Sequence, residues 1–453
     1  MIRTPALARR LGLPEAVGQS VAVVCPSVGM AFNVVLCVQV AGAAAPLAFL
    51  LGTCVMAIVA LSFVAFARRQ PHAGAAYAYI AHAFGPWLGV LAGWTMLLAY
   101  LGFTTSMAAL AADFIIAALA EAGLHAAGTA LPIAAGCVLV CAWLAWRDTR
   151  FASRLMLAME AFSVAAILVL AFAIFLHLGR HNGWSAAPFH ASSAPHGLSS
   201  LGYGMVFAIL SLAGFEGATT ISEETTNPRR TVPLAMLATV LGSGVFFVIV
   251  STAVVLGYGL DHMADLAAAQ APLDDLARAR IGPGFAALLD SANAVSAFSS
   301  ILGALTGAVR LLYALGRVGL WPRLTEINPR HRTPGLSIAV CTGLVLLPIC
   351  LCLPWVRAAD YYGYLSTIAT LALILVYGAV TVAEGVEAAR KRRALWVGLG
   401  TAGTLGLGWA LLCSIVPVPA PPANLWPALV VAWVAAGLFL PWLRPAMRNR
   451  LAG

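Results

Sequence analysis

Long apolar stretches recur along this chain, and their length is the feature that most restricts its fold. A helix needs about 20 apolar residues to cross the hydrocarbon core of a bilayer, and twelve segments reach that length. Backbone groups in lipid must be hydrogen-bonded by the spanning structure itself, so runs of this length indicate helices. The expected spans are residues 17–40, 44–67, 86–118, 129–147, 152–177, 199–222, 232–258, 284–315, 335–354, 359–384, 395–416 and 424–443.

The composition excludes most other classes of protein. Of the 453 residues, 61% are hydrophobic and 9% are charged, whereas soluble domains carry about 25% charged residues. A water-facing surface for a chain of this size cannot be built from so few charges. We therefore exclude a soluble enzyme, a disordered chain and a nucleic-acid-binding domain, and we expect an all-α integral membrane protein in contact with the lipid bilayer.

The basic residues predict the orientation in the membrane. If the segment 1–16 is cytoplasmic, 22 of the 26 Lys and Arg residues fall on the cytoplasmic side of the expected spans. This asymmetry follows the positive-inside rule, and it also places the segment 444–453 in the cytoplasm. The net charge of +9 is thus a sign of topology, and no nucleic-acid partner is expected. All the basic residues but Lys391 are Arg, which is typical of a GC-rich bacterial genome and favours the bacterial inner membrane.

Two of the expected helices contain interruptions. Pro26 lies within the first span, where it removes a hydrogen-bond donor, and Gly29 follows it. In the sixth span, Glu216 lies between Gly214 and Gly217. Either could be an ordinary kink, but breaks in the first helix and the sixth are typical of two inverted five-helix repeats with a binding site at the midplane. The expected units are residues 17–178 and 199–385, followed by two further helices in 394–443.

Three motifs, in the same order along the chain, resemble those of the amino acid/polyamine/organocation (APC) superfamily of permeases. The first surrounds the turn after span two and comprises Pro71, Gly74, Tyr77, Tyr79, Gly85, Pro86, Gly93 and Trp94. The second follows the break in span six and comprises Gly214-Phe215-Glu216, Glu223-Glu224, Asn227-Pro228-Arg229 and Pro233. The third ends span eight and comprises Arg310, Tyr313, Ala314, Arg317, Gly319 and Pro322. The resemblance implies a twelve-helix, five-plus-five inverted-repeat fold and secondary transport of amino acids or related amines.

The resemblance and the breaks together predict a substrate site. Half-helix ends expose amide groups that suit a carboxylate and carbonyl groups that suit an ammonium. We expect the amides of Val28, Gly29 and Met30 to receive a carboxylate, and the carbonyls of Cys25, Leu210 and Ala213 to lie near an ammonium. The whole set of expected substrate-binding residues is Cys25, Ser27, Val28, Gly29, Met30, Phe207, Leu210, Ala213, Gly214 and Phe215.

The chain departs from the family pattern at the first break and at the gate. The family commonly has G-S-G in the first broken helix, where this chain has Ser27-Val28-Gly29. The aromatic residue that usually precedes the second break by one turn is Leu210 here. Phe207 or Phe215 could take the place of that ring.

Two carboxylates at membrane depth are candidates for proton coupling, because a charged group at the centre of a helix is costly to insert. Glu216 lies at the second break, and it is either a protonatable switch beside the substrate or a structural cap of the helix after Gly217. Glu160 lies in span five, where proton-coupled relatives often carry a Lys. It either titrates in place of that Lys or pairs with an Arg such as Arg154.

Other polar groups leave the coupling open. Asp113 and Asp290 lie near the outer ends of their spans, where they are either hydrated or select a cationic substrate. No metal site or cofactor is expected; a proton gradient is the expected energy source, and a sodium site remains an alternative.

The sequence thus predicts a transporter, not an enzyme, that moves a small neutral amino acid by alternating access, with proton coupling or exchange. An organic amine or polyamine importer is the alternative, followed by a non-transporting nutrient receptor and an integral membrane enzyme. A monomer or a homodimer is expected.

Overall fold

The computed structural model describes residues 10–443 and 447, except for 122, 125, 127, 148, 182, 329, 330 and 417–420. Every regular element in this part of the chain is a helix, and its β pairing consists of one isolated parallel bridge between Leu11 and Thr225. The all-α class predicted from the apolar runs is confirmed. Most of the expected terminal segments 1–16 and 444–453 lies outside the described residues.

Ten segments of the described chain are long and apolar enough to cross a membrane. The first, Leu13–Arg69, contains three consecutive helices, α1 (Leu13–Val24), α2 (Pro26–Ala41) and α3 (Ala45–Arg69). Helices occupy each of the twelve ranges expected from the sequence, although α8 (Leu198–Ser211) is too short to be counted as a span by itself. A multi-pass membrane protein is confirmed, whereas the number of twelve crossings and the inverted repeat stay predictions.

The remaining helices follow the expected ranges, with short additions between them. They are α4 (Ala76–Phe84), α5 (Pro86–Glu121), α6 (Ala130–Arg147), α7 (Thr149–Arg180), α9 (Gly217–Thr220), α10 (Pro228–Tyr258), α11 (Met263–Ala268), α12 (Pro272–Arg280), α13 (Pro283–Arg317), α14 (Gly335–Cys352), α15 (Ala358–Arg390), α16 (Ala394–Ile415) and α17 (Trp426–Leu443). Helix α4 is an addition that the search for long apolar runs missed, because its nine residues are too few for a span. It buries Tyr79 and Ile80.

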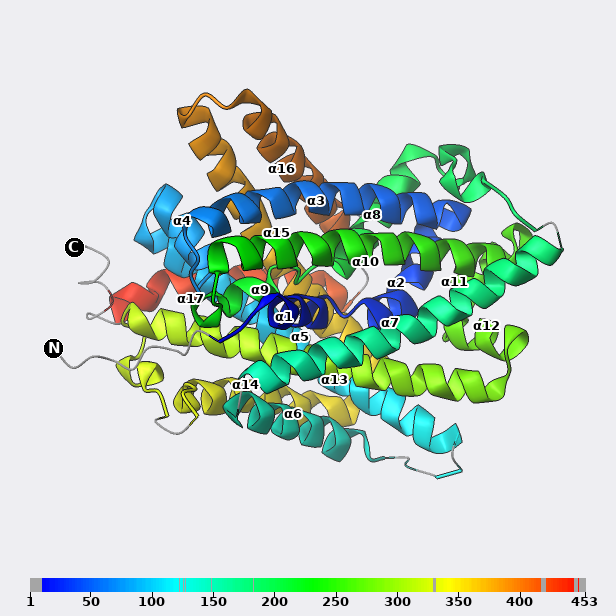
Figure 1. Cartoon of the computed structure of the whole chain (residues 1–453), viewed down its shortest axis with the longest axis horizontal. Helices are drawn as coiled ribbons and strands as arrows, with labels where there is room; N and C mark the ends of the chain where they lie inside the picture. Colours follow the sequence, from blue (N-terminus) through cyan, green and yellow to red (C-terminus); the bar gives the residue numbers. More distant parts are fainter. Residues whose placement is uncertain are drawn as a thin grey trace.

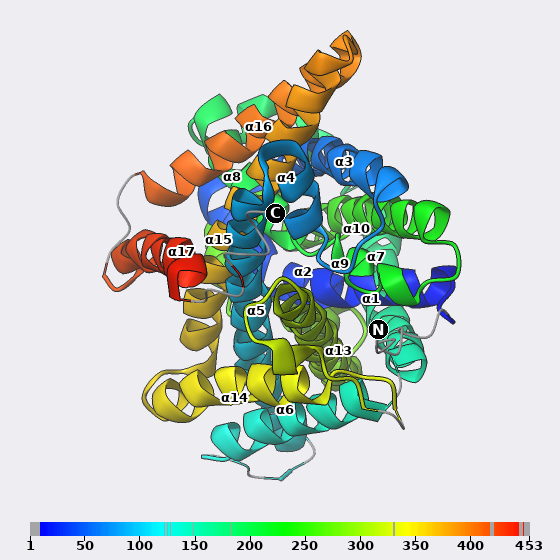
Figure 2. The same ribbon diagram turned by 90° about the vertical axis from the view of Figure 1, so that its left-hand side faces the viewer.

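Helices α1 and α2 lie inside the bundle, and longer helices surround them (Figures 1 and 2). The long α5 packs against both α13 and α15, and α3 packs against α10. In α13, 89% of the most apolar window is buried, compared with 22% in α16 and 11% in α17. The last two helices therefore lie at the periphery of the bundle, where their apolar side chains face the lipid.

Close packing around α1 depends on small residues. A Cβ atom added at Gly18 would lie 2.3 Å from the backbone oxygen of Ser153 in α7. That distance is shorter than any real carbon–oxygen contact, so only glycine lets the two helices approach this closely. The path of α1 through the middle of the bundle is thereby fixed by its sequence.

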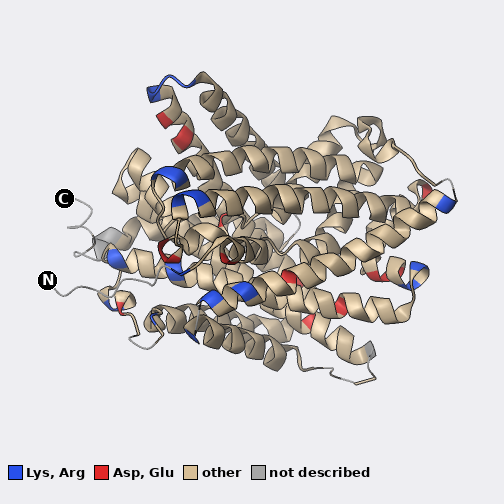
Figure 3. Ribbon diagram, viewed as in Figure 1, with Lys and Arg blue, Asp and Glu red and all other residues tan. Residues whose placement is uncertain are grey.

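Charged side chains divide the bundle into two ends. Most Lys and Arg residues gather at the end where α3 and α13 finish and α10 begins (Figure 3). We call this the basic end. The opposite end carries the segment α11–α12 with its aspartates. The basic residues that the positive-inside argument assigns to one side of the membrane thus also lie at one end of the bundle.

Candidate functional site

The first break is a single residue. Helix α1 ends at Val24, α2 begins at Pro26, and Cys25 between them has φ 51° and ψ 63°, in the left-handed region. The Cys25 amide still donates to the carbonyl of Val21 at 2.8 Å, and the Gly29 amide donates to the carbonyl of Cys25 at 3.0 Å. Proline suits the first position of a helix because it has no N–H to leave unpaired. The amides of Ser27 and Val28 then come before the hydrogen-bond ladder of α2, in the first turn, where amides have no partner within the helix. The Val28 amide hydrogen-bonds instead to the Cys25 side chain.

The second break is wider. Helix α8 ends at Ser211, residues 212–216 form turns, and the four-residue α9 begins at Gly217. Gly214 has φ +100°, a conformation that L side chains rarely adopt, and its added Cβ atom would lie 2.4 Å from the Cγ1 atom of Val23. The second break is therefore pressed against the last turn of α1, directly before Cys25. The two interruptions predicted from the sequence are both present, and they lie side by side.

Glu216 is anchored by two tyrosines from other helices. Its carboxylate, which is fully buried, accepts a hydrogen bond from the Tyr100 hydroxyl of α5 at 2.9 Å and another from the Tyr377 hydroxyl of α15. The Tyr377 oxygen in turn accepts the Gly214 amide at 2.8 Å. The carboxylate thus ties the second break to two long helices. Neither tyrosine was among the residues singled out from the sequence, since an isolated Tyr in an apolar helix gives no signal.

The structural alternative for Glu216, a cap on the following helix, is wrong. Glu216 is the N-cap residue of α9, but its side chain makes no capping hydrogen bond. The Ala218 amide donates instead to the hydroxyl of Ser20 at 2.8 Å, and that hydroxyl donates to the Phe215 carbonyl at 2.7 Å. A serine of α1 therefore satisfies the start of α9, and the Glu216 carboxylate binds the two tyrosines and the backbone amides of Gly214 and Glu216 within the break.

A small cavity lies between the two breaks, and it admits little more than about one water molecule. Its lining comes from α1, α2, α5, α8, α15 and the two breaks: Val23, Val24, Cys25, Gly29, Asn33, Phe103, Met107, Leu210, Ser211, Ala213, Tyr362 and Ser366. We call it the central cavity. It brings together four of the predicted residues, Cys25, Gly29, Leu210 and Ala213. Asn33 donates to the Ser211 hydroxyl at 2.8 Å, and this polar pair was not found from the sequence.

The other predicted residues lie around the central cavity rather than on its lining. Ser27, Val28 and Met30 are buried in the first turns of α2. Phe215 packs against Phe63 and Tyr377, with ring centroids 5.3 Å apart in each pair.

Phe207 lines a separate cavity between α2, α8, α15 and α16, and Leu210 lines both cavities. Neither of the two rings considered as gates therefore touches the central cavity.

Glu160 is connected to the first break through a serine. Its buried carboxylate accepts hydrogen bonds from the Ser296 hydroxyl of α13, at 3.1 and 3.0 Å. The same hydroxyl lies 3.2 Å from the Cys25 sulfur. The alternative partner, Arg154, instead forms an ion pair with Glu15 of α1 at 2.7 Å. A polar chain thus runs from the central cavity to the carboxylate of α7.

Aromatic side chains form a partition between the central cavity and a second cavity. Phe32 of α2 packs against Tyr362 of α15, at a centroid distance of 5.4 Å, and against Phe114 of α5, at 6.1 Å. Tyr362 lines the central cavity, whereas Phe32 and Phe114 line a cavity nearer the end opposite the basic end. We call the second space the outer cavity. Its lining includes Asp290, one of the two interfacial aspartates; the other, Asp113, is exposed.

The basic end is closed beneath the breaks. The amides of Arg10 and Leu11 donate to the Glu224 carbonyl at 2.9 and 3.0 Å, and the Thr226 amide donates to the Leu11 carbonyl at 2.9 Å. The buried guanidinium of Arg310 in α13 contacts the Glu224 carboxylate at 2.6 Å. Glu224, a residue of the family motifs, therefore binds both the chain before α1 and Arg310 of α13, which is another motif residue.

A second ion pair lies beside this closure and outside the expected spans. Arg317 donates to Glu223 at 2.5 and 3.2 Å, and His72 lies near both residues. Burial alone would raise the pKa of Glu223, but the hydrogen bonds and the charge of Arg317 lower it below the ordinary value. Burial is also the largest influence on the pKa of His72, and it lowers that value.

An all-helical membrane bundle with two abutting helix breaks and a small cavity between them is typical of secondary transporters. A family model described as amino acid permease matches residues 16–442. The low-affinity putrescine importer PlaP of Escherichia coli K12 is 26% identical over 67% of this chain and 66% of its own length. The branched-chain amino acid permease BcaP of Lactococcus lactis is 27% identical over 65% of each chain.

The matched regions therefore span about two thirds of these relatives' own lengths. A solved structure of a Na⁺-coupled sialic acid symporter, in a substrate-bound, outward-open state, covers 90% of this chain with a TM-score of 0.53 and 14% identity; 91% of that chain is covered. At that identity, the likeness concerns the fold alone. The chain belongs to the amino acid permease family, whose members are transporters and not enzymes.

Proposed function

We propose that this protein is a secondary transporter that moves a small neutral amino acid across the bacterial inner membrane by alternating access. The observation that carries the proposal is the contact between the two breaks, with the central cavity between them. A spanning helix loses backbone hydrogen bonds at a break, and such losses occur where the backbone lines a cavity or a binding site. Two breaks that meet at one cavity supply both an amide end and a carbonyl end for a zwitterion.

The substrate carboxylate would bind at the start of α2, where the dipole of the helix favours negative charge. The Ser27 amide is the first candidate donor, because the Gly29 amide is bound to the Cys25 carbonyl in this conformation. The Val28 amide, which hydrogen-bonds to the Cys25 side chain, would have to exchange that partner for the substrate. The ammonium would lie near the carbonyls of Leu210 and Ala213 at the end of α8, with the oxygen of Asn33 beside them. The small size of the central cavity implies that the substrate enters in a more open conformation.

Coupling would use protons or exchange for a second amino acid, with Glu160 and Glu216 as the candidate titrating groups. Both carboxylates are buried. Glu216 lies within the second break, and Glu160 is connected to the first break through Ser296. Sodium remains the alternative coupling ion. In the proposed orientation, the basic end faces the cytoplasm, as do both termini, and the protein acts as a monomer or a homodimer.

The second candidate function is import of an organic amine. PlaP, whose name describes a putrescine importer, supports it. The aspartates of the outer cavity supply negative charge on the route to the central cavity. In that case, the carboxylate site at the start of α2 would stay unused.

A matched pair of compounds tests the two candidates. We would purify the protein, reconstitute it into liposomes and measure counterflow of labelled L-leucine, with isoamylamine, its decarboxylated form, as competitor. The amino acid proposal predicts counterflow that excess L-leucine blocks and isoamylamine does not. Counterflow of isoamylamine alone would favour the amine importer, and counterflow of neither compound, with other neutral amino acids also inactive, would contradict the amino acid proposal.

A further inference from the structure

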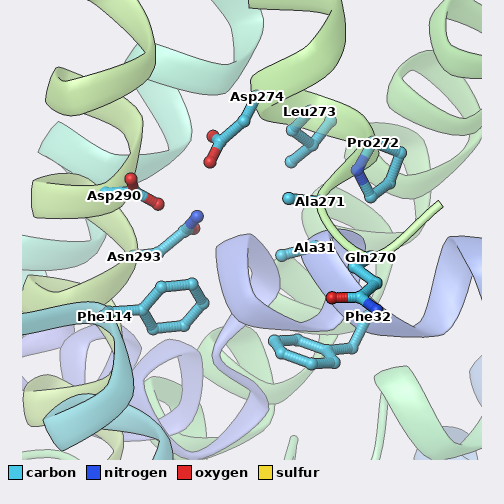
Figure 4. Close-up of a pocket in the computed structure, with 10 residues that line it drawn as sticks. All are labelled: Ala31, Phe32, Phe114, Gln270, Ala271, Pro272, Leu273, Asp274, Asp290 and Asn293. Atoms are coloured by element: carbon cyan, nitrogen blue, oxygen red, sulfur yellow. The ribbon is translucent and has the colours of Figure 1, made fainter. Parts of the chain in front are cut away.

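The outer cavity contains an acidic pair that the central site does not use. It lies between α2, α5, α12 and α13 at the end of the bundle opposite the basic end (Figure 4). Asp274 of α12 and Asp290 of α13 line it, and their carboxyl groups hydrogen-bond to each other. Two carboxylates at this distance repel each other unless a proton or another cation lies between them.

Asn293 adds a buried oxygen that lacks a partner. Its side chain is one turn along α13 from Asp290, is 3% exposed and points into the outer cavity. Among the described residues, no donor reaches its Oδ1 atom. A buried acceptor without a donor is unfavourable, and such a group at the wall of a cavity indicates a ligand that donates hydrogen bonds. Figure 4 shows the side-chain amide group of Asn293 beside Asp290, on the same side of the cavity as the two carboxyl groups.

Aromatic rings form another part of the lining. Phe32 and Phe114 face the cavity, and Ala31, Ala271, Pro272 and Leu273 are also apolar. The face of an aromatic ring attracts an organic cation, and an apolar lining suits an alkyl group more than a strongly hydrated metal ion. A ligand with a carboxylate of its own would be repelled by the acidic pair. The chemistry therefore favours an amine without a carboxylate.

We propose that the outer cavity binds a protonated alkyl amine, with its ammonium group donating to Asp274, Asp290 and Asn293 and its alkyl chain against Phe32 and Phe114. This site is distinct from the central cavity, because the rings of Phe32 and Tyr362 lie between the two spaces. The inference goes beyond the proposed function, since the outer cavity can bind an amine whether or not the central cavity carries amino acids.

The acidic pair also predicts a pH dependence of amine binding. Burial and the nearby Asp290 raise the pKa of Asp274 to about 7. The other groups that act on this carboxyl are Arg278, which lowers the pKa, and Asp275, which raises it. The residues of α2 and α5 that line the cavity are not titratable. Two further contacts of α12 involve titratable groups of the adjacent helices. Asp275 accepts a hydrogen bond from Tyr258 of α10, and Arg280 hydrogen-bonds to His177 of α7.

The test is equilibrium binding of labelled isoamylamine to the full-length protein in lipid nanodiscs. Alkyl amines stay protonated between about pH 6 and pH 8, because their pKa values resemble that of Lys. We expect Asp274→Asn and Asp290→Asn each to raise the Kd about tenfold or more, the effect of losing a charge-assisted contact. Asn293→Leu, which removes the free oxygen and keeps the volume, should also weaken binding.

The matched control is Asp265→Asn, which makes the same change at an exposed aspartate in the same loop. It should leave the Kd unchanged, and all variants should keep the thermal stability of the parent. The affinity of the parent protein should fall from about pH 8 to about pH 6, as Asp274 takes up a proton, and this fall should vanish in Asp274→Asn. L-Leucine should not displace isoamylamine from the outer site.

Three results would overturn the proposal. Binding of isoamylamine that persists unchanged in Asp274→Asn and Asp290→Asn would place the amine elsewhere. Displacement by Na⁺ at equal concentration would make the site one for a metal cation. An equal loss in Asp265→Asn would reduce the effect to the net charge of the loop. Because the readout is binding of an amine, it is independent of leucine counterflow, which tests the central cavity.

Discussion

Glu216 is held by hydroxyl groups that come from helices on two sides of the second break. Tyr100 and Tyr377 are 277 residues apart in the chain, yet both donate to the same buried carboxylate. Hydrogen bonds to a charged group contribute about 1.5–3 kcal/mol each, so the pair offsets much of the cost of burying that charge. Any movement of α5 relative to α15 must alter at least one of these bonds. The carboxylate is therefore placed to link the geometry of the break to movements of the bundle.

Glu216→Gln should leave the protein folded and abolish or uncouple transport. The amide keeps one acceptor oxygen for the tyrosines but loses the charge, so we expect a loss of thermal stability of about 1–3 kcal/mol. Counterflow and proton-driven uptake in liposomes, with the melting temperature in detergent, would measure both effects. Glu326→Gln is the matched control, because Glu326 is exposed after the end of α13. Normal, pH-dependent uptake by Glu216→Gln would remove this residue from the mechanism.

Glu160→Gln should change the pH dependence of transport more than the affinity for the substrate. The amide oxygen can still accept from Ser296, which keeps the connection to Cys25. It cannot take up a proton, so the uptake rate should lose its dependence on pH, while KM changes by less than about threefold. Uptake assays between about pH 5.5 and pH 8 would measure this difference. A pH profile identical to that of the parent protein would make Glu160 a structural residue.

At the scale of the elements, the second break depends on one backbone conformation. Gly214→Ala places a Cβ atom 2.4 Å from Val23 and forces an L residue to φ +100°. A strained backbone of this kind costs about 1–3 kcal/mol, so the melting temperature should fall and transport should be lost. Gly242→Ala is the control, since nothing lies within 4 Å of its added Cβ atom. Equal stability and activity of the two variants would contradict the role given to the break.

The cluster of His72, Glu223 and Arg317 predicts how stability responds to acid. Burial lowers the pKa of His72 in the folded protein, so the unfolded chain binds more protons once the pH falls below about 6.5. Its contribution is present above that pH and is lost as the pH decreases. That of Glu223, whose pKa is also lowered, is lost at a lower pH.

We therefore expect the melting temperature to decrease from about pH 7.5 to pH 5.5, and His72→Gln to reduce this decrease. The exposed His262 at the other end of the bundle serves as the control in His262→Gln. An identical pH dependence of the melting temperature in the parent and in His72→Gln would show that this cluster has no such effect.

For the whole molecule, the features that could be predicted are those that leave a long apolar run or a single telling residue, such as Pro or Gly, in the sequence. Apolar length fixed the helices, and Pro26 and Gly214 marked the breaks, because both residues change the backbone where they stand. The partners of the breaks could not be found in this way. Ser20, Tyr100 and Tyr377 meet the second break only after α1, α5 and α15 have packed. The partition formed by Phe32 and Tyr362 likewise depends on the packing of α2 against α15. Asp290 was noted as interfacial, but its partner Asp274 is in α12, a helix of nine residues that is too short to give an apolar run.

Alternating access requires that the closure at the basic end open during each cycle. The strand-like pairing of Leu11 with Thr225 joins the segment before α1 to the segment after α9. A cysteine pair at these two positions should form a disulfide, since paired backbones bring Cα atoms within the usual range of about 4.4–6.8 Å. Oxidation of the double variant Leu11→Cys/Thr225→Cys should stop transport, and reduction should restore it. Each single variant, treated with the same oxidant, controls for the native cysteines. Unchanged counterflow in the cross-linked protein would mean that this closure stays shut throughout the cycle, and that the substrate reaches the basic end by another route.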